Sequence, residues 1–222
     1  MDKQVEKALT AALKEYSIIS KTSVSDFGRR VIDVFNLDLS FMEKVGLMDE
    51  AFDDEPKIEM LREVFFDLLM INFFTEDVKK LEEDYLDSEE WEAIEEETID
   101  RGTELLNVLL YIRECKDEDL EPELEDFLKE FLLVEEDEFQ DEHRIYEDVI
   151  ANQILMESSI EEIAKVSNEL PDDSELKDMF YPMMGFFFQP DPSDEDWDDY
   201  VKNSVDPEFD GSIYALLTSF NN

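Results

Sequence analysis

The stretch IEMLREVFFDLLMINFF, residues 58–74, constrains the fold more than any other part of the chain. Between Val64 and Phe74 only Asp67 and Asn72 are polar, so no face of a helix built from this segment would be polar throughout. A helix that is apolar nearly all round is typically buried by other helices, and its uninterrupted apolar run is too short to span a bilayer. We therefore predict a buried helix here, with an aromatic patch exposed to a partner as the alternative.

Residues that favour turns are scarce in this chain. Only five Gly and seven Pro occur among 222 residues, which leaves little turn chemistry for a many-stranded sheet. Helix-starting patterns recur instead, as at Ser88 and Ser159. From Trp91 to Ile112 residues spaced by three and four, apart from one skipped turn, predict one long helix. No sequence period repeats, which argues against a solenoid. The predicted fold is all-α: a compact multi-helix array or bundle with short loops and no β-sheet of consequence.

Charge divides the chain into unequal parts. The formal net charge is -44 at pH 7, of which residues 1–50 carry -2 and residues 51–222 carry -42. The change in charge coincides with a cluster of acids and Pro56 that interrupts the helical pattern. We expect a near-neutral N-terminal helical segment (1–52), a strongly acidic helical core (53–190) and an acidic C-terminal helix-loop-helix (191–222), all packed as one domain.

This negative field excludes several classes of partner. Direct nucleic-acid binding needs Lys and Arg to neutralise phosphates, and anionic membrane surfaces repel an acidic protein. Basic proteins and divalent cations are attracted to it. The first residues lack the apolar run of a signal peptide, and the single cysteine, Cys115, rules out an internal disulfide. We therefore expect a protein of the cytoplasm.

Motifs of known catalytic chemistry are absent from the sequence. The only histidine, His143, has Gln140 three residues before it, so the Glu-x-x-His pattern of carboxylate-bridged di-iron sites is missing. No glycine-rich phosphate loop, G-x-S-x-G or H-E-x-x-H occurs. Acids surround Cys115 and disfavour its thiolate form. We expect a protein that is not an enzyme and has no resident cofactor.

The segment DPEFDGSI, residues 206–213, resembles the first half of an EF-hand calcium loop. Position 6 of the loop is Gly211, but position 12, which supplies a bidentate Glu in EF-hands, is Leu217. The resemblance thus implies at most weak Ca²⁺ binding. The alternative, which we favour, is an acidic turn in which Gly211 permits a bend and Asp210 or Ser212 caps the last helix. The candidate ligands, at loop positions 1, 3 and 5, are Asp206, Glu208 and Asp210.

Three classes of function remain. The first is a non-enzymatic acidic binding protein that masks a basic surface on a partner protein, as inhibitors, immunity proteins and DNA mimics do. The second is a structural or regulatory helical protein that self-associates through residues 58–74 or through Phe186–Phe188. The third is a protein that binds divalent metals weakly through clustered carboxylates. We favour the first.

Two acidic patches are the candidate surfaces for contact with Lys and Arg of a basic protein partner. Trp197 and Tyr200 are candidate aromatic anchors beside the second patch, with inward packing of both rings as the alternative. The first patch comprises Glu135, Glu136, Asp137, Glu138, Asp141 and Glu142, and the second comprises Asp194, Glu195, Asp196, Asp198 and Asp199.

Overall fold

The computed structural model describes residues 1–76, 83–131 and 143–222. Throughout these ranges the chain forms helices joined by short loops, with no β-strand, which confirms the predicted all-α class. The first half contains α1 (Lys3–Ser20), α2 (Ser25–Asn36), α3 (Phe41–Asp53), a 3-10 helix (Pro56–Leu61), α4 (Arg62–Glu76), α5 (Glu83–Leu86), α6 (Glu89–Thr98) and α7 (Leu105–Asp117). The second half contains α8 (Leu124–Phe131), α10 (Glu147–Ala151), a 3-10 helix (Gln153–Glu157), α11 (Ile160–Glu169), α12 (Lys177–Phe188), α13 (Asp194–Asn203) and α14 (Pro207–Asn221).

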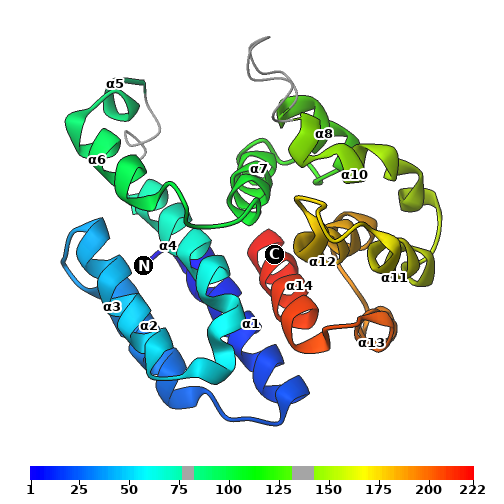
Figure 1. Ribbon diagram of the computed structural model, residues 1–222, viewed down its shortest axis with the longest axis horizontal. Helices are drawn as coiled ribbons and strands as arrows, with labels where there is room; N and C mark the ends of the chain where they lie inside the picture. Colours follow the sequence, from blue (N-terminus) through cyan, green and yellow to red (C-terminus); the bar gives the residue numbers. More distant parts are fainter. Residues whose placement is uncertain (77–82, 132–142) are drawn as a thin grey trace.

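Helices from both ends of the chain form the centre of the molecule. Helix α1 makes its most extensive contacts with α14, and the two lie side by side in Figure 1. Helix α14 also packs on α7 and α12, while α4 packs on α1, α3 and α7. Helices α2 and α3 lie on one side of this centre and α11 to α13 on the other (Figure 1). The predicted boundary at residue 52 falls within α3.

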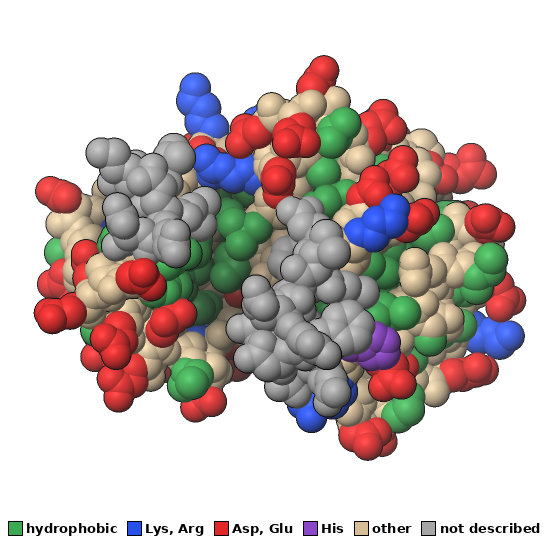
Figure 2. Space-filling view, turned by 90° about the horizontal axis from the view of Figure 1, so that it is seen from above, with side chains coloured by type: hydrophobic (Ala, Val, Ile, Leu, Met, Phe, Trp, Pro, Cys, Tyr) green, Lys and Arg blue, Asp and Glu red, His purple; other side chains and the backbone are tan. Residues whose placement is uncertain are grey.

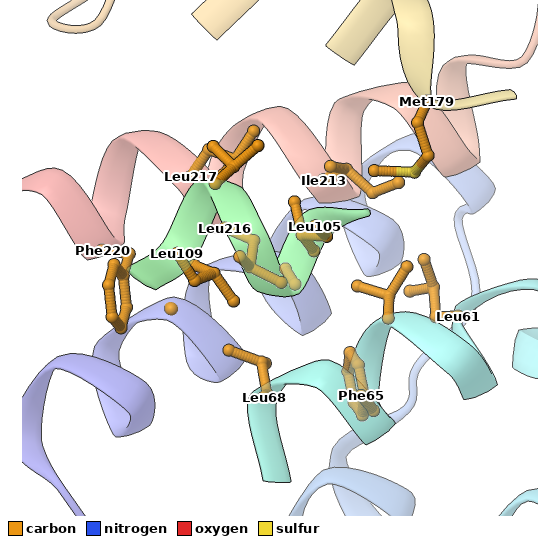
Figure 3. Packing of buried hydrophobic residues seen from close by; sticks show 14 of the residues in the cluster. Leu61, Phe65, Leu68, Leu105, Leu109, Met179, Ile213, Leu216, Leu217 and Phe220 are labelled. Carbon is orange, nitrogen blue, oxygen red and sulfur yellow. The ribbon is translucent and has the colours of Figure 1, made fainter. Parts of the chain in front are cut away.

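The core lies where α4, α7 and α14 meet. Figure 3 shows side chains from these helices pointing toward one another, with Met179 of α12 beside them. Burying one Leu or Phe side chain contributes about 1.5–3 kcal/mol, so this contact region is a main source of stability. The buried residues labelled there are Leu61, Phe65, Leu68, Leu105, Leu109, Met179, Ile213, Leu216, Leu217 and Phe220.

The apolar stretch from Val64 to Phe74 is buried along its whole length, as predicted. Its rings pack against those of neighbouring helices: Phe65 lies 5.6 Å from Phe52 between ring centroids, and Phe73 lies 5.0 Å from Phe41. Phe186 and Phe187 are buried as well. Neither segment is therefore an exposed apolar face in the monomer.

The predicted long helix from Trp91 to Ile112 is wrong, because the chain breaks between α6 and α7. Thr103 donates from its backbone N–H to both Asp67 oxygens (3.0 and 3.1 Å) and from its hydroxyl to Asp67 Oδ2 (2.6 Å). Gly102 has a φ of 83°, and a Cβ there would lie 2.6 Å from Asp67 Oδ1. The buried carboxylate of α4 thus holds a turn that only glycine fits without strain.

A column of stacked aromatic rings joins α12, α13 and α14. The ring centroids of Tyr181 and Tyr200 lie 4.6 Å apart, those of Tyr200 and Tyr214 lie 4.0 Å apart, and those of Tyr214 and Trp197 lie 5.1 Å apart. A Cβ on Gly185 would lie 2.5 Å from Cε2 of Tyr200, so glycine lets this ring approach the α12 backbone. Because all three helices share the column, their relative positions are fixed.

Candidate functional site

The second predicted acidic patch forms one end of α13. Ser193 caps this helix: its hydroxyl accepts a hydrogen bond from the N–H of Asp196 (3.3 Å), and its own N–H donates to Asp196 Oδ2 (2.9 Å). The Ser193 hydroxyl also donates to Asp196 Oδ2 (2.7 Å), and this bond, followed by the one from the Ser193 N–H, lowers the pKa of Asp196. Carboxylates in the first turn of a helix also interact favourably with its dipole. Asp196 therefore both stabilises the start of α13 and adds to its charge.

The carboxylates of α13 face solvent. Asp194, Glu195, Asp196 and Asp198 are exposed and Asp199 is partly exposed. In the described part of the chain, Asp199 pairs with Lys202 of the same helix at 3.7 Å. On the face seen from above in Figure 2, which is not the face of α13, acidic side chains are numerous and Lys and Arg are few. The first predicted patch, residues 135–142, lies outside the described residues.

The two candidate anchors differ in their orientation. Tyr200 is 1% exposed, and its pKa is raised by burial, so its ring belongs to the core. Trp197 is partly buried: one side of its indole stacks on Tyr214, and its Nε1–H donates to Oε1 of Glu15 (3.2 Å). Tyr200 therefore packs inward, as the alternative prediction stated, whereas Trp197 keeps part of its surface in solvent.

The calcium-like segment does not form a loop. Helix α14 already begins at Pro207, with Asp206 as its N-cap accepting from the N–H of Phe209 (3.3 Å). The expected cap at Asp210 or Ser212 is wrong, because Pro207 suits the first helical position and starts the helix earlier.

Gly211 lies within α14 and permits no bend, contrary to our expectation. A Cβ there would lie 2.6 Å from Cδ1 of Ile19, so this glycine allows α14 to approach α1 closely. Ala or a larger residue would need the Ile19 side chain to move. The described part of the chain contains no group of three or more His, Cys, Asp or Glu side chains that could hold a metal ion.

A pocket of about 800 Å³ lies beside the α13–α14 junction. Its walls come from the start of α4 with the preceding 3-10 helix, the turn at 102–104, the end of α11, the start of α12 and residues 205–210. We call it the acidic pocket, because Lys177 is the one cation among its lining residues, beside six carboxylates. These are Glu63, Glu104, Glu175, Asp178, Asp206 and Asp210.

Besides Asp206, which caps α14, and Asp210, three of these carboxylates are held by neighbours. Glu104 accepts from the hydroxyl of Tyr146 (2.6 Å), and Glu175 pairs with Arg144 (3.1 Å). Glu63 pairs with Arg101 (3.0 Å) and accepts from the N–H of Gly102 (2.7 Å). Lys177 is itself engaged by Asp172, a residue outside the pocket lining. The walls are thus positioned by hydrogen bonds and ion pairs within the chain.

Asp210 is the most buried carboxylate of the pocket lining. It is 5% exposed, and Oδ2 accepts a hydrogen bond of 2.5 Å from the hydroxyl of Ser204. Burial raises its pKa to about 7, and the negative charges of Asp206 and Asp178 act in the same direction. This carboxyl group therefore loses its proton only near neutral pH, because its burial and the neighbouring negative charges both oppose ionisation.

Sequence reasoning did not anticipate this pocket. Its carboxylates come from segments more than 140 residues apart, and no local pattern joins them. The one available signal was the acidic stretch 206–210, which we interpreted as a calcium-like turn.

Comparison with protein-family models gives no match, and comparisons with curated proteins and with solved structures give no significant match. Over the ranges that the structure describes, no helix combines the length and the apolar character needed to cross a lipid bilayer. Function is therefore inferred from the chain itself.

Proposed function

We propose that this protein is a non-enzymatic acidic binding protein that masks a basic surface on a partner protein. The observation that supports the proposal best is the exposed acidic surface of α13, whose carboxylates Asp194, Glu195, Asp196, Asp198 and Asp199 share a single helix with one cation, Lys202. Inhibitors, immunity proteins and mimics of the DNA backbone work on this principle, and the proposed setting is the cytoplasm.

The electrostatics favour rapid capture of a positively charged protein. A net charge of -44 produces a long-range attraction that raises association rates at low ionic strength. At physiological salt the Debye length is about 8 Å, so the attraction that remains there comes from charges close to the contact. A dense local set such as that on α13 is therefore more effective than the same charges dispersed over the surface.

The surface on α13 is also pre-organised. The helix is capped by Ser193, and the aromatic column fixes it to α12 and α14. A rigid surface loses less conformational entropy on binding than a mobile one. The partly exposed face of Trp197 provides apolar contact area beside the charges.

The test begins with affinity capture from host lysate at about 50 mM salt, followed by a wash at about 500 mM, which shortens the Debye length severalfold. A basic protein released by the wash is identified, purified and titrated against wild type. The variant carries Asp194→Asn, Glu195→Gln, Asp198→Asn and Asp199→Asn, leaving the helix-capping Asp196 in place.

The matched control neutralises four exposed acids on α6: Glu92, Glu95, Glu96 and Glu97, each changed to Gln. Both variants lose the same charge, so a difference between them reports the location of the contact. We expect the α13 variant to bind at least about tenfold more weakly and with a shallower salt dependence, and the control to change much less. Capture that is independent of salt would contradict the proposal, and so would recovery of no basic protein.

A further inference from the structure

We infer that the acidic pocket receives one Lys or Arg side chain of the basic partner. The inference rests on the proposed function, and it concerns a site at the C-terminal end of α13, whereas the exposed acidic surface occupies the N-terminal part of that helix.

The size of the pocket suits an inserted group. About 800 Å³ lies within the range of roughly 300–1,000 Å³ that is typical of ligand-binding pockets. This space accommodates one extended side chain together with part of the backbone that carries it. A flat surface would offer a cation only partial desolvation.

The charge of the pocket selects a cation. Six of its lining residues are acids, of which Glu63 and Glu175 pair with Arg101 and Arg144, and its single lysine, Lys177, is paired with Asp172. In the described part of the chain the other four carboxylates line the cavity without an ion pair: Glu104, Asp178, Asp206 and Asp210. Asp210 is the most buried of these acids and accepts a hydrogen bond from the hydroxyl of Ser204 (2.5 Å). Its carboxylate is almost fully buried, and the charged groups that act on it most strongly, Asp206 and Asp178, are negative. An inserted ammonium or guanidinium group supplies a counter-charge where the fold places like charges together.

The apolar part of the lining selects an organic cation over a hydrated metal ion. Met60 is 39% exposed and Val205 is 72% exposed, so both keep apolar surface in solvent. Phe209 and Met179 add to the apolar lining. The methylene stem of Lys or Arg packs on such surface while its head group interacts with carboxylates.

A side chain of a protein fits better than a free polyamine. The pocket adjoins residues 204–206, which follow α13 directly, so one basic surface can contact α13 and insert a side chain into the pocket at the same time. A free polyamine uses only the pocket.

The experiment follows methionine methyl groups by NMR in the full-length protein. Met60 and Met179 line the pocket, whereas Met48 is buried in α3 and serves as an internal control. The probes are acetyl-Gly-Lys-Gly-amide, its Arg analogue, its norleucine analogue and spermidine. Norleucine keeps the apolar stem of lysine and lacks the charge.

The pocket variant combines Glu175→Gln with Asp178→Asn, two exposed residues whose replacement leaves the core intact. The control variant combines Asp194→Asn with Glu195→Gln on α13 and loses the same charge. We expect the Lys and Arg peptides to shift the resonances of Met60 and Met179 saturably. The pocket variant should bind them at least about tenfold more weakly and the control less than about threefold, because the remaining long-range attraction is screened.

Four outcomes would overturn the inference: equal weakening in both variants, equal binding of the norleucine peptide, binding of spermidine without binding of the peptides, and shifts at Met48 equal to those at Met60. The peptide test uses no partner protein, so it distinguishes the two proposals. If a basic protein is captured but the peptides do not bind, only the inference about the pocket is overturned. If the peptides bind but no basic protein is captured, the proposed function is overturned.

Discussion

The buried carboxylate of Asp210 predicts an unusual dependence of stability on pH. Its ordinary pKa is 3.8, and burial, followed by the charges of Asp206 and Asp178, raises it to about 7 in the folded protein. Below pH 3.8 the group is protonated in both states and has no effect. Between pH 3.8 and about 7 the unfolded chain loses the proton while the folded chain keeps it, so stability falls as pH rises. Above pH 7 the loss is complete.

The expected magnitude follows from the two pKa values. One pKa unit corresponds to about 1.4 kcal/mol, so the rise from 3.8 to about 7 amounts to about 4 kcal/mol. The aromatic neighbours Tyr181 and Tyr200 add no charge change, because burial raises the pKa of each hydroxyl further from this range. Asp210→Asn removes the titration and keeps an oxygen that can accept from Ser204.

Urea unfolding of wild type and Asp210→Asn, followed by circular dichroism from about pH 5 to about pH 8 at constant ionic strength, measures this effect. Contributions that do not involve residue 210 cancel between the two proteins, so the difference between the two free energies of unfolding reports Asp210 together with its interactions with Asp206 and Asp178. Between pH 5 and pH 8 it should move in favour of the variant by about 3 kcal/mol, because about two of the three pH units between the two pKa values lie above pH 5. The exposed Asp198→Asn is the control and should show a constant difference. Parallel pH profiles for wild type and Asp210→Asn would refute the reasoning.

Four further predictions concern packing, salt and binding. Gly185→Ala should destabilise the fold by about 1–3 kcal/mol, because its Cβ would lie 2.5 Å from the ring of Tyr200. An unchanged melting temperature in thermal unfolding would contradict this. Gly46→Ala, in α3 with no atom within 4 Å of the new Cβ, should instead stabilise by about 0.5–1 kcal/mol in the same assay. The melting temperature should rise with added NaCl, since screening weakens repulsion among the acids; a constant value would count against that view. The Lys peptide should bind more tightly at pH 8 than at pH 6 as Asp210 ionises, and calorimetry showing the reverse would exclude a contribution from that carboxylate.

Local patterns sufficed to predict the all-α class and the buried helix. The apolar run from Val64 to Phe74 can be buried only by surrounding helices, and Ser88 and Ser159 cap α6 and α11 as predicted. The break between α6 and α7 was not predicted, because it depends on Asp67, which lies 36 residues before its partner Thr103. The spacing of three and four skips one turn between Thr98 and Leu105, and this gap, which contains Gly102, coincides with the break.

The candidate sites, too, could be predicted only where they depend on residues that are neighbours in sequence. The carboxylates of α13 are neighbours in sequence, so their common exposed surface was predictable. The inward orientation of Tyr200 depends on Tyr181 and Tyr214, which lie on other helices. The acidic pocket depends on tertiary contacts throughout, and composition in a chain with 63 acids gives no indication of which ones meet.

The pairing of α1 with α14 has a consequence for synthesis of the protein. The apolar face of α1, with Val5, Leu9 and Leu13, is synthesised before its main partner α14, which follows about 186 residues later. At a synthesis rate of about 5–20 residues per second, about 10–40 s pass between the synthesis of this face and that of α14. During that interval the nascent chain exposes apolar surface of the kind that chaperones bind. Nascent chains that stop before α14 should therefore be recognised as unfolded and degraded, so that only chains that include the last helix accumulate.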